Sequence, residues 1–510
     1  MPTRILPTLQ RARRAILLTL ALAFLPQAHG QTLEWAAVKF FQYNIENVVV
    51  TPDVPGTWKV RVVFSVTNPQ SGLPWNIKND LPFISAGASN LTLDIGWDPS
   101  SDFTNTGSAG PLLQQQVSKA LGTGAAVPVQ VRNLVAVANV CNSPTECPGA
   151  VSLVNRFWVE RPVTPVKFVQ SVTTGRVALE GRPVCNGVAG FGYGGCPPGP
   201  TPTTYVNIPV TSAAQSFTFQ PSDPKTAMIA DPRRPIVDIA KCKACHDGNR
   251  HGDTIVPRLS LHGGNRNENL KVCVLCHNPN QTDVPYRTLT TPAGLPADPR
   301  VSGPEVPVDF KTMVHAIHAG GFRETPFVVI GRDSSINDFS GVRFPATLSN
   351  CVNCHIDANG KGTFELPLKP SVLGTTIRTQ SVYQVAQDKI DPLTKAVLVP
   401  GQLRTIDVDP SNDLRISPIA ATCSACHDKA EVRSHMIRTG GASFSTLQSA
   451  IGVTVKERCA SCHGPGRDED VRRAHEIRSA RSSGSSGSGD AAQPRRGGND
   501  DDVDNDDDDD

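Results

Sequence analysis

Cys242-Lys-Ala-Cys245-His246 is the first of five stretches that share the spacing Cys-x-x-Cys-His and decide how the second half of this chain folds. The other four are Cys273-Val-Leu-Cys276-His277, Cys351-Val-Asn-Cys354-His355, Cys423-Ser-Ala-Cys426-His427 and Cys459-Ala-Ser-Cys462-His463. Two thiols at this spacing bond covalently to a porphyrin, and the histidine that follows binds its iron. The sequence therefore predicts five covalently bound c-type haems.

Paired cysteines also bind zinc or carry redox chemistry, and both alternatives fit this chain less well. The gap between Cys245 and Cys273 exceeds that of a zinc ribbon, and a histidine follows every pair. A thioredoxin-like protein needs one such pair within a βαβ unit, whereas here the pairs recur through a loop-rich stretch. Haem attachment is therefore the favoured interpretation.

A haem iron has a second axial position, and the chain has enough histidines to fill it at every site. Outside the motifs and the N-terminal segment, the histidines are His251, His262, His315, His318, His435 and His475. Beyond Met1, the only methionines are Met228, Met313 and Met436, so His/Met ligation at all five irons is excluded. We expect bis-histidine ligation throughout, with one histidine to spare.

Two predicted helices carry some of these histidines. The segment 309–319 has helical character and ends at Gly320-Gly321, so His315 and His318 share one face and could serve two neighbouring haems. The segment 468–479 is the second predicted helix and holds His475. The alternative for both segments is a solvent-exposed helix whose histidines bind no haem iron.

From residue 33 to 235 the hydrophobic pattern has a period of two, which is typical of half-buried strands. Residues 58–67 and 91–97 alternate most clearly, with Thr92 and Asp94 on the polar face of the second strand. Further strands are expected near residues 127–131, 157–160, 177–179 and 206–210. Short strands between Pro, Gly and Asn turns favour an all-β sandwich or barrel.

The sequence thus predicts a multidomain fold, in which an N-terminal all-β domain precedes a pentahaem cytochrome c domain with short helices and little regular structure.

Four other cysteines form two local pairs, Cys141 with Cys147 and Cys185 with Cys196. We predict that both are loop-closing disulfides in an oxidising compartment. A redox-active pair is the alternative, although neither spacing is Cys-x-x-Cys.

The N-terminal segment has the features of a secretory signal peptide. Four arginines between residues 4 and 14 precede an apolar stretch at 15–25 and a cleavage site at Ala28-His29-Gly30. This stretch is too short to span a bilayer, so we expect an exported mature chain without a transmembrane segment.

The expected boundaries are 1–30 for the signal peptide, 31–235 for the β-rich domain, 236–481 for the pentahaem domain and 482–510 for a disordered Ser/Gly linker and acidic tail.

The formal charge of +2 hides a strongly acidic end, because nine aspartates lie within residues 500–510. With 39% hydrophobic and 5% aromatic residues, the supply of core side chains is lean, so we expect haems to fill part of the interior. Each haem also adds two propionates, which makes the holoprotein more acidic than its chain. Strong affinity for nucleic acid is therefore not expected.

Several strings beside the motifs are more specific than haem attachment requires. They are Leu261-His262-Gly263-Gly264-Asn265-Arg266, Cys276-His277-Asn278-Pro279, Asp309-Phe310-Lys311-x-Met313-Val314-His315-x-Ile317-His318, Asp338-Phe339-Ser340 and Cys462-His463-Gly464-Pro465-Gly466. In these strings the chain resembles the OmcA/MtrC family of outer-membrane multihaem c-type cytochromes. The resemblance is specific from about residue 230 to about residue 480 and looser in the strand-rich region.

In that family a split Greek-key β-barrel precedes a five-haem domain, and the pair is usually repeated. The resemblance implies a distal ligand set and leaves His251 as the spare histidine; the implied ligands are His262, His315, His318, His435 and His475. It also implies other multihaem cytochromes and an outer-membrane porin as partners. Two departures are that one β-plus-haem unit is present and that the lipid-attachment cysteine of surface members is absent.

We expect an electron-transfer protein rather than an enzyme, relaying electrons through bis-histidine haems in extracellular electron transfer or dissimilatory metal reduction. Metal reduction at exposed haems falls within this expectation, and the acceptors would be extracellular or periplasmic. One alternative is a multihaem reductase with one open haem site, although no Cys-x-x-Cys-Lys motif occurs. Another is a soluble periplasmic electron shuttle. The expected location is the periplasm or the outer-membrane cell surface.

Overall fold

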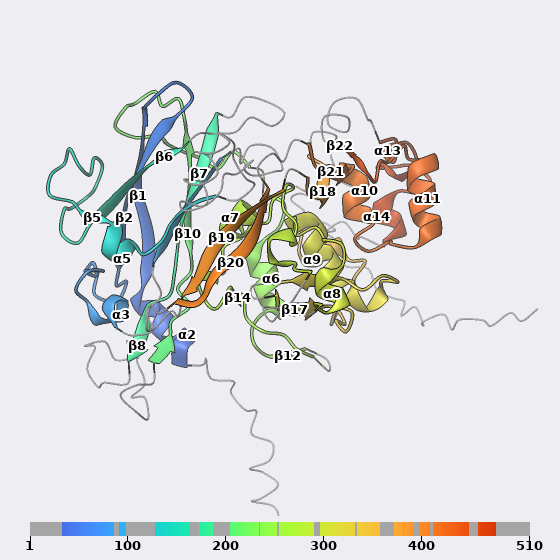
Figure 1. The fold of residues 1–510 in the computed structure, drawn as a ribbon, viewed down its shortest axis with the longest axis horizontal. Coiled ribbons are helices and arrows are strands. Elements are labelled where there is room, and N and C mark those ends of the chain that lie inside the picture. Colours follow the sequence, from blue (N-terminus) through green and yellow to red (C-terminus); the bar gives the residue numbers. More distant parts are fainter. Residues whose placement is uncertain are drawn as a thin grey trace, which may run out of the picture.

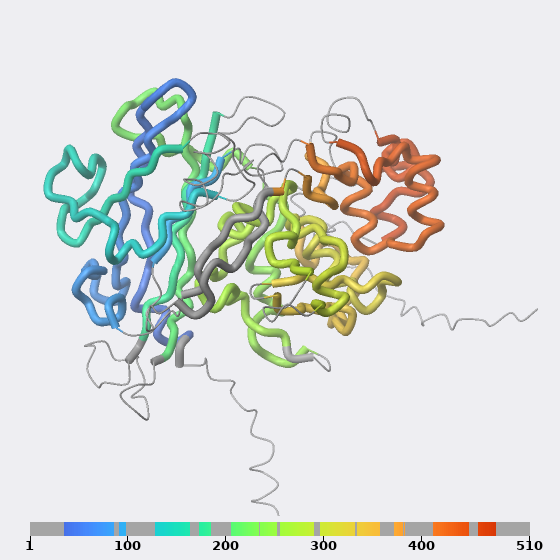
Figure 2. Tube along the Cα trace, viewed as in Figure 1, coloured from blue at the N-terminus to red at the C-terminus, as the bar shows by residue number. Residues whose placement is uncertain are grey.

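The computed structural model describes residues 33–85, 91–97, 128–163, 173–186, 205–233, 235–251, 254–289, 296–331, 334–356, 372–380, 382–390, 397–407, 412–447 and 457–475. In Figure 1 the long blue to green strands lie on one side of the molecule, and the short yellow to red helices lie on the other. Figure 2 follows the same path along the chain. The protein is therefore multidomain and rich in sheet, with few and short helices.

Two antiparallel sheets make up the strand-rich part. The first has the order β1 (Gln42–Pro52), β2 (Trp58–Thr67), β6 (Phe157–Val163) and β5 (Asn139–Val140). The second has the order β11 (Met228–Ile229), β10 (Ala213–Thr218), β7 (Thr174–Glu180), β3 (Thr92–Trp97) and β4 (Val129–Val131). The Ala227 amide donates to the Val48 carbonyl at 2.7 Å, which joins the two sheets along one side.

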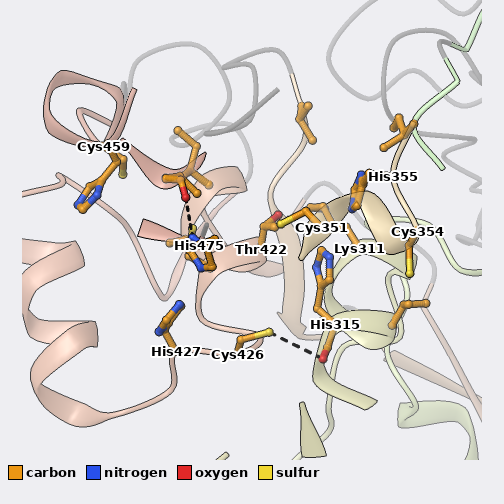
Figure 3. Close-up of a pocket in the computed structure, with 18 of the residues that line it drawn as sticks. Lys311, His315, Cys351, Cys354, His355, Thr422, Cys426, His427, Cys459 and His475 are labelled. Atoms are coloured by element: carbon orange, nitrogen blue, oxygen red, sulfur yellow. Dashed lines mark hydrogen bonds between the residues drawn. The ribbon is translucent and has the colours of Figure 1, made fainter. Parts of the chain in front are cut away.

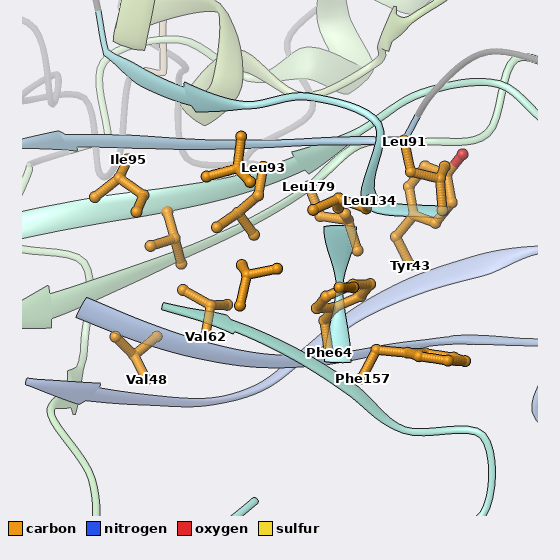
Figure 4. Packing of buried hydrophobic residues seen from close by; sticks show 14 of the residues in the cluster. Tyr43, Val48, Val62, Phe64, Leu91, Leu93, Ile95, Leu134, Phe157 and Leu179 are labelled. Carbon is orange, nitrogen blue, oxygen red and sulfur yellow. The ribbon is translucent and has the colours of Figure 1, made fainter. Parts of the chain in front are cut away.

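The main hydrophobic core lies between these two sheets (Figure 4). Val48 and Val62 of the first sheet face Leu93, Ile95 and Leu179 of the second, and all five side chains are fully buried. Short elements border this core, namely α2 (Leu33–Ala37), η1 (Val38–Phe40), α3 (Leu81–Ile84), α5 (Leu134–Val137) and the hairpin of β8 (Val184–Asn186) with β9 (Tyr205–Asn207). Because apolar residues of both sheets meet face to face, the arrangement is a β-sandwich.

The predicted strands at 58–67 and 91–97 are confirmed by β2 and β3, and those near 127–131, 157–160 and 177–179 by β4, β6 and β7. The last predicted strand is shorter than expected, because β9 ends at Asn207. Ile208 and Val210 lie beyond its end and are nevertheless buried.

The prediction that one face of β3 is exposed to solvent is wrong, because this strand is buried on both faces. Asp94 has no exposed surface, and Gln130 of β4 donates to its carboxyl group at 2.9 Å. On the same outer face of the sheet, Ala178 packs against Val272 and Leu275 of the C-terminal part. An alternating pattern marks two faces of different polarity, but another part of the protein can cover the polar face in place of water.

The C-terminal part is built from short helical turns and small strand pairs. Its helices are α6 (Ile239–Cys245), α7 (Leu270–Cys276), η2 (Val284–Tyr286), α8 (Pro299–Ser302), α9 (Phe310–His318), η3 (Gly320–Phe322), η5 (Cys351–Asn353), α10 (Pro418–Cys423), α11 (Ala430–Arg438), α13 (Ala460–His463) and α14 (Val471–Ala474). The paired strands are β12 (Arg250–His251) with β13 (Thr254–Ile255), β14 (Ser260–Leu261) with β15 (Arg266–Asn267), β16 (Val328–Ile330) with β17 (Ile336–Asp338), β19 (Val382–Ile390) with β20 (Val397–Asp407), and β18 (Thr375–Arg378) with β21 (Leu414–Ile416) and β22 (Thr446–Leu447).

The predicted helix at 309–319 is confirmed by α9, which starts after Asp309 and is followed directly by η3. Within the described residues the predicted helix at 468–479 is shorter, because α14 begins at Val471 and ends at Ala474; residues 476–479 lie outside them. Asp470 accepts a hydrogen bond from the Arg472 amide at the start of α14. An aspartate in this position satisfies a free amide at a helix start, which explains why the helix begins there.

One of the two predicted disulfides, Cys141–Cys147, is present. The second involves Cys196, which lies outside the described residues, as do the predicted signal peptide and the acidic tail. Among the helices that the structure describes, none has the length and apolar character needed to cross a bilayer.

Leu93→Ala tests the packing of the sandwich core. Removing this fully buried side chain leaves a cavity, so we expect a loss of about 2–5 kcal/mol in the free energy of unfolding. Urea denaturation followed by far-UV circular dichroism measures this loss. Leu73→Ala, at a leucine that is 66% exposed, is the matched control and should cost less than about 0.5 kcal/mol. Equal losses in both variants would contradict the described core.

Candidate haem-binding sites

All five Cys-x-x-Cys-His motifs adopt the same local structure, a single helical turn. In each, the histidine amide donates to the carbonyl of the first cysteine at 2.8–2.9 Å; the pairs are His246 to Cys242, His277 to Cys273, His355 to Cys351, His427 to Cys423 and His463 to Cys459. Positions i, i+3 and i+4 lie on one face of such a turn. Each turn therefore places two thiols and one imidazole on the same side.

Side-chain caps start two of these turns. Asp238 accepts a hydrogen bond from the Ala240 amide before α6, and Asn269 accepts one from the Lys271 amide before α7. Both residues satisfy amides that a short helix leaves without intrahelical partners. Since α6 and α7 are only seven residues long, such caps help to fix where their cysteines lie.

Each motif histidine has one other histidine opposite its ring. The distances between ring centres are 6.1 Å for His246 and His318, 5.9 Å for His277 and His262, 6.0 Å for His355 and His315, 5.9 Å for His427 and His475, and 6.1 Å for His463 and His435. These five partners are the histidines that the family resemblance implies as distal ligands. The five pairs share no member.

A separation of this size suits one metal ion between two imidazoles. A metal–nitrogen bond of about 2 Å on each side, plus about 1 Å from each ring centre to its nitrogen, makes a distance of about 6 Å. By contrast, among the described residues no three His, Cys, Asp or Glu side chains gather around one metal position, as a tetrahedral zinc site requires. The residues present therefore fit an iron held axially by two histidines.

Backbone carbonyls orient several of these rings. The Nδ1 atom lies 2.8–3.1 Å from a carbonyl oxygen in five histidines; the contacts are His246 with Pro257, His277 with Val308, His318 with Val314, His463 with Glu469 and His475 with Val471. An Nδ1–H that donates to a carbonyl leaves Nε2 as the unprotonated atom. The Nε2 lone pair is then available for a metal ion.

Burial favours the neutral form of five of the paired imidazoles. It lowers the pKa of His262 to about 3, and it also lowers the pKa of His277, His315, His318 and His427 below the usual value. A protonated imidazole cannot bind a metal ion, so a low pKa removes a competitor for the nitrogen lone pair. These five histidines are therefore suited to metal binding at neutral pH.

One cavity of about 660 Å³ runs along the histidine pairs (Figure 3). It is lined by at least one member of every pair, including both members of the His315–His355, His427–His475 and His435–His463 pairs. Apolar groups form most of its wall, such as Val314, Val372 and Ile419. A continuous apolar space beside paired imidazoles and cysteines has the character that porphyrin rings need.

Neighbouring motifs contact each other. The thiols of Cys242 and Cys354 share a hydrogen bond, which lowers the pKa of Cys354 to about 7. The Cys426 thiol lies 3.9 Å from the His315 carbonyl oxygen. A further electrostatic interaction links Cys423 with Cys459. The motifs that begin at Cys242, Cys351, Cys423 and Cys459 are thus adjacent in that order.

Helix α9 joins three of the sites. Its first amide, that of Phe310, donates to the His277 carbonyl at 3.1 Å, which anchors the helix to the second motif. His315 and His318 then face His355 and His246, two motifs far apart in the sequence. One helix therefore serves two sites, as their spacing on one face predicted.

The remaining histidine, His251, has a different environment. Its Nε2 lies 3.0 Å from the Asp247 carboxylate, and its side chain is partly exposed. This arrangement agrees with the expectation that His251 is the histidine left over.

Sequence reasoning did not identify Glu457. Its carboxylate accepts hydrogen bonds from the Ser417 hydroxyl and from the amides of Ile419 and Ala420, at 2.6–2.8 Å. It therefore caps α10, which carries Cys423, although it lies two residues before Cys459 in the sequence. No local pattern marks this role, because the capped helix begins at Pro418, far earlier in the chain.

Comparison with protein families found one match. A model described as outer membrane cytochrome MtrC/MtrF-like, domains II/IV, matches residues 234–476. This range contains all five motifs and all five histidines opposite them. Searches of curated proteins and of solved structures found no match.

Glu457→Ala tests the link between the last two motifs. Each donor left without its acceptor costs about 1–3 kcal/mol, so we expect amide hydrogen exchange within Pro418–Cys423 to accelerate at least about tenfold. Hydrogen exchange with mass spectrometry on the haem-loaded protein measures this change. Glu324→Ala is the control, since this glutamate is 55% exposed and its ion pair with Lys429 spans 3.9 Å. Unchanged exchange in Glu457→Ala would show that the cap is unimportant.

Proposed function

Because residues 234–476 belong to the family of MtrC/MtrF-like outer membrane cytochromes, domains II/IV, we propose that this chain binds five c-type haems and relays electrons through them. The observation that carries the proposal is the set of five histidine pairs, each with ring centres 5.9–6.1 Å apart and each beside one Cys-x-x-Cys turn. The family itself implies covalently bound haem and electron transfer. The number of haems and their ligation by two histidines are our proposal.

In this proposal the ten motif cysteines form the thioethers, and the five histidine pairs bind the irons. The cysteines are Cys242, Cys245, Cys273, Cys276, Cys351, Cys354, Cys423, Cys426, Cys459 and Cys462. Burial raises the pKa of Cys273 to about 11 and that of Cys276 to about 12, so these thiols stay uncharged until they react. The carbonyls that accept from Nδ1 would hold five of the ten imidazole rings in the orientation that the iron requires.

The bound haems would supply reversible one-electron chemistry at iron. Two histidines at each iron leave no axial position for a small molecule, so the chain's own residues favour electron transfer over substrate chemistry. The contacts between motifs provide the path: Cys242 with Cys354, Cys426 with the His315 backbone, and Cys423 with Cys459. The last motif lies nearest to solvent, because Cys462 is exposed. We propose that electrons enter or leave the chain there.

The strand-rich part and the domain limits complete the proposal. We propose a β-rich domain at 31–235 with split Greek-key topology and a pentahaem domain at 236–481. The contact between Ala178 and Leu275 and the hydrogen bond from Arg176 to the Lys271 carbonyl support close packing of these two domains. In that arrangement the sandwich covers one side of the second haem site.

His262→Ala tests the ligand assignment. The thioethers remain, so the haem content should stay at five per chain, while one iron loses an axial ligand. We expect the reduced variant to bind about one carbon monoxide per chain and its oxidised spectrum to show a high-spin component. His251→Ala is the matched control and should match the wild-type protein, for which we expect no carbon monoxide binding. Carbon monoxide binding by wild-type protein would favour a reductase with an open site.

The family also suggests export to the cell surface, and we propose surface exposure with other multihaem cytochromes and an outer-membrane porin as partners. Protease treatment of intact cells, followed by haem staining, tests this location. The haem-stained band should disappear while a periplasmic marker survives. Protection of the band would instead support a periplasmic shuttle without direct contact with extracellular acceptors.

A further inference from the structure

The outer face of the five-stranded sheet holds two buried carboxyl groups, those of Asp94 and Glu180. In the register of β3 and β7, Asp94 pairs with Ala178 and Thr92 pairs with Glu180. Asp94 and Glu180 are thus diagonal neighbours on one face, within reach of each other's side chains. Asp94 is 0% exposed and Glu180 is 3% exposed.

The charges around this pair favour one bound proton. The two buried carboxyl groups interact with each other, and two ionised carboxylates side by side in a buried site would repel. Gln130 donates to Asp94 at 2.9 Å, and the Arg266 guanidinium donates to Glu180 at 2.8 Å. One buried cation balances one carboxylate, so the other carboxyl group is held as the neutral acid.

The electrostatic surroundings place this proton near neutral pH. Burial, and then the charge of Asp94, raise the pKa of Glu180 to about 8, although Arg266 acts in the opposite direction. Burial also raises the pKa of Asp94. Glu180 also acts electrostatically on Tyr43 of β1, and Arg132, which follows β4, acts on both carboxyl groups.

The pair lies beside the second motif. Asp94 and Glu180 both interact electrostatically with the Cys276 thiol, and Glu180 also interacts with that of Cys273. The Arg266 guanidinium links the carboxyl pair to the second motif, since its charge acts on both Glu180 and His277. A change of one unit of charge at the iron position therefore changes the proton affinity of the carboxyl pair.

We propose that the Asp94–Glu180 pair is a proton-binding site coupled to the iron bound between His262 and His277. At a pH where the pair has lost its shared proton in the oxidised protein, the arrival of one electron from the donor in the relay would make the pair take up one proton from solvent, and one O–H bond forms. When the electron leaves, that bond breaks and the proton returns to solvent. This inference rests on the proposed function, and it assigns to the strand-rich part a role in setting the potential of one haem.

Spectroelectrochemical titration of the haem-loaded protein at several pH values tests the coupling. Proton uptake on reduction makes reduction harder as protons become scarce, so one of the five midpoint potentials should fall with rising pH between about pH 7 and about pH 9. In Glu180→Gln and in Asp94→Asn this slope should disappear. Glu160→Gln is the matched control, since it removes a carboxylate of the other sheet, and it should keep the slope.

A slope that persists in both variants would assign the proton to another group and overturn the proposal. Infrared difference spectra of the wild-type protein provide a second measurement that needs no variant. Reduction should increase a protonated-carboxyl band, and its absence would likewise overturn the inference. If the wild-type protein shows five low-spin haems but no pH-dependent potential, only this inference fails. If the second haem is missing, the proposed function fails instead.

Discussion

Every candidate site depends on one constraint: two neutral imidazoles must face each other at about 6 Å, with two thiols on the same side as one of them. The chain meets this constraint five times with the same device, a single helical turn closed by a hydrogen bond from the histidine amide to the first cysteine. The opposite imidazole comes from another element each time. Because each site ties together separate elements, haem attachment would itself bring order to a region with little regular structure.

The sites are also arranged so that they are not independent. Helix α9 places His315 and His318 at two different motifs, and Glu457 caps the helix of one motif while it precedes the cysteines of the next. A disturbance at one site is therefore expected to spread to its neighbours. The sandwich adds a rigid wall, because its outer face packs against α7 and buries the Asp94–Glu180 pair there. Fixed distances are what an electron relay requires of its protein.

Local chemistry was predictable from the sequence. The five motifs, the helix that carries His315 and the main strands follow from spacing and periodicity within a few residues. The pairing of histidines was not predictable, and proximity in the sequence would have misassigned it. His475 follows His463 closely yet faces His427, whereas His435 follows His427 and faces His463. Such choices arise from how the turns pack in space, as do the burial of Asp94 and the cap by Glu457.

The central claim is that two histidines bind each of the five irons. Quantitative electron paramagnetic resonance of the fully oxidised wild-type protein tests it most directly, because each ferric iron with two imidazole ligands gives a low-spin signal. The account predicts five haems per chain whose ferric irons all give low-spin signals, and no high-spin ferric signal. A stoichiometric high-spin signal, or a haem content other than five per chain, would contradict it.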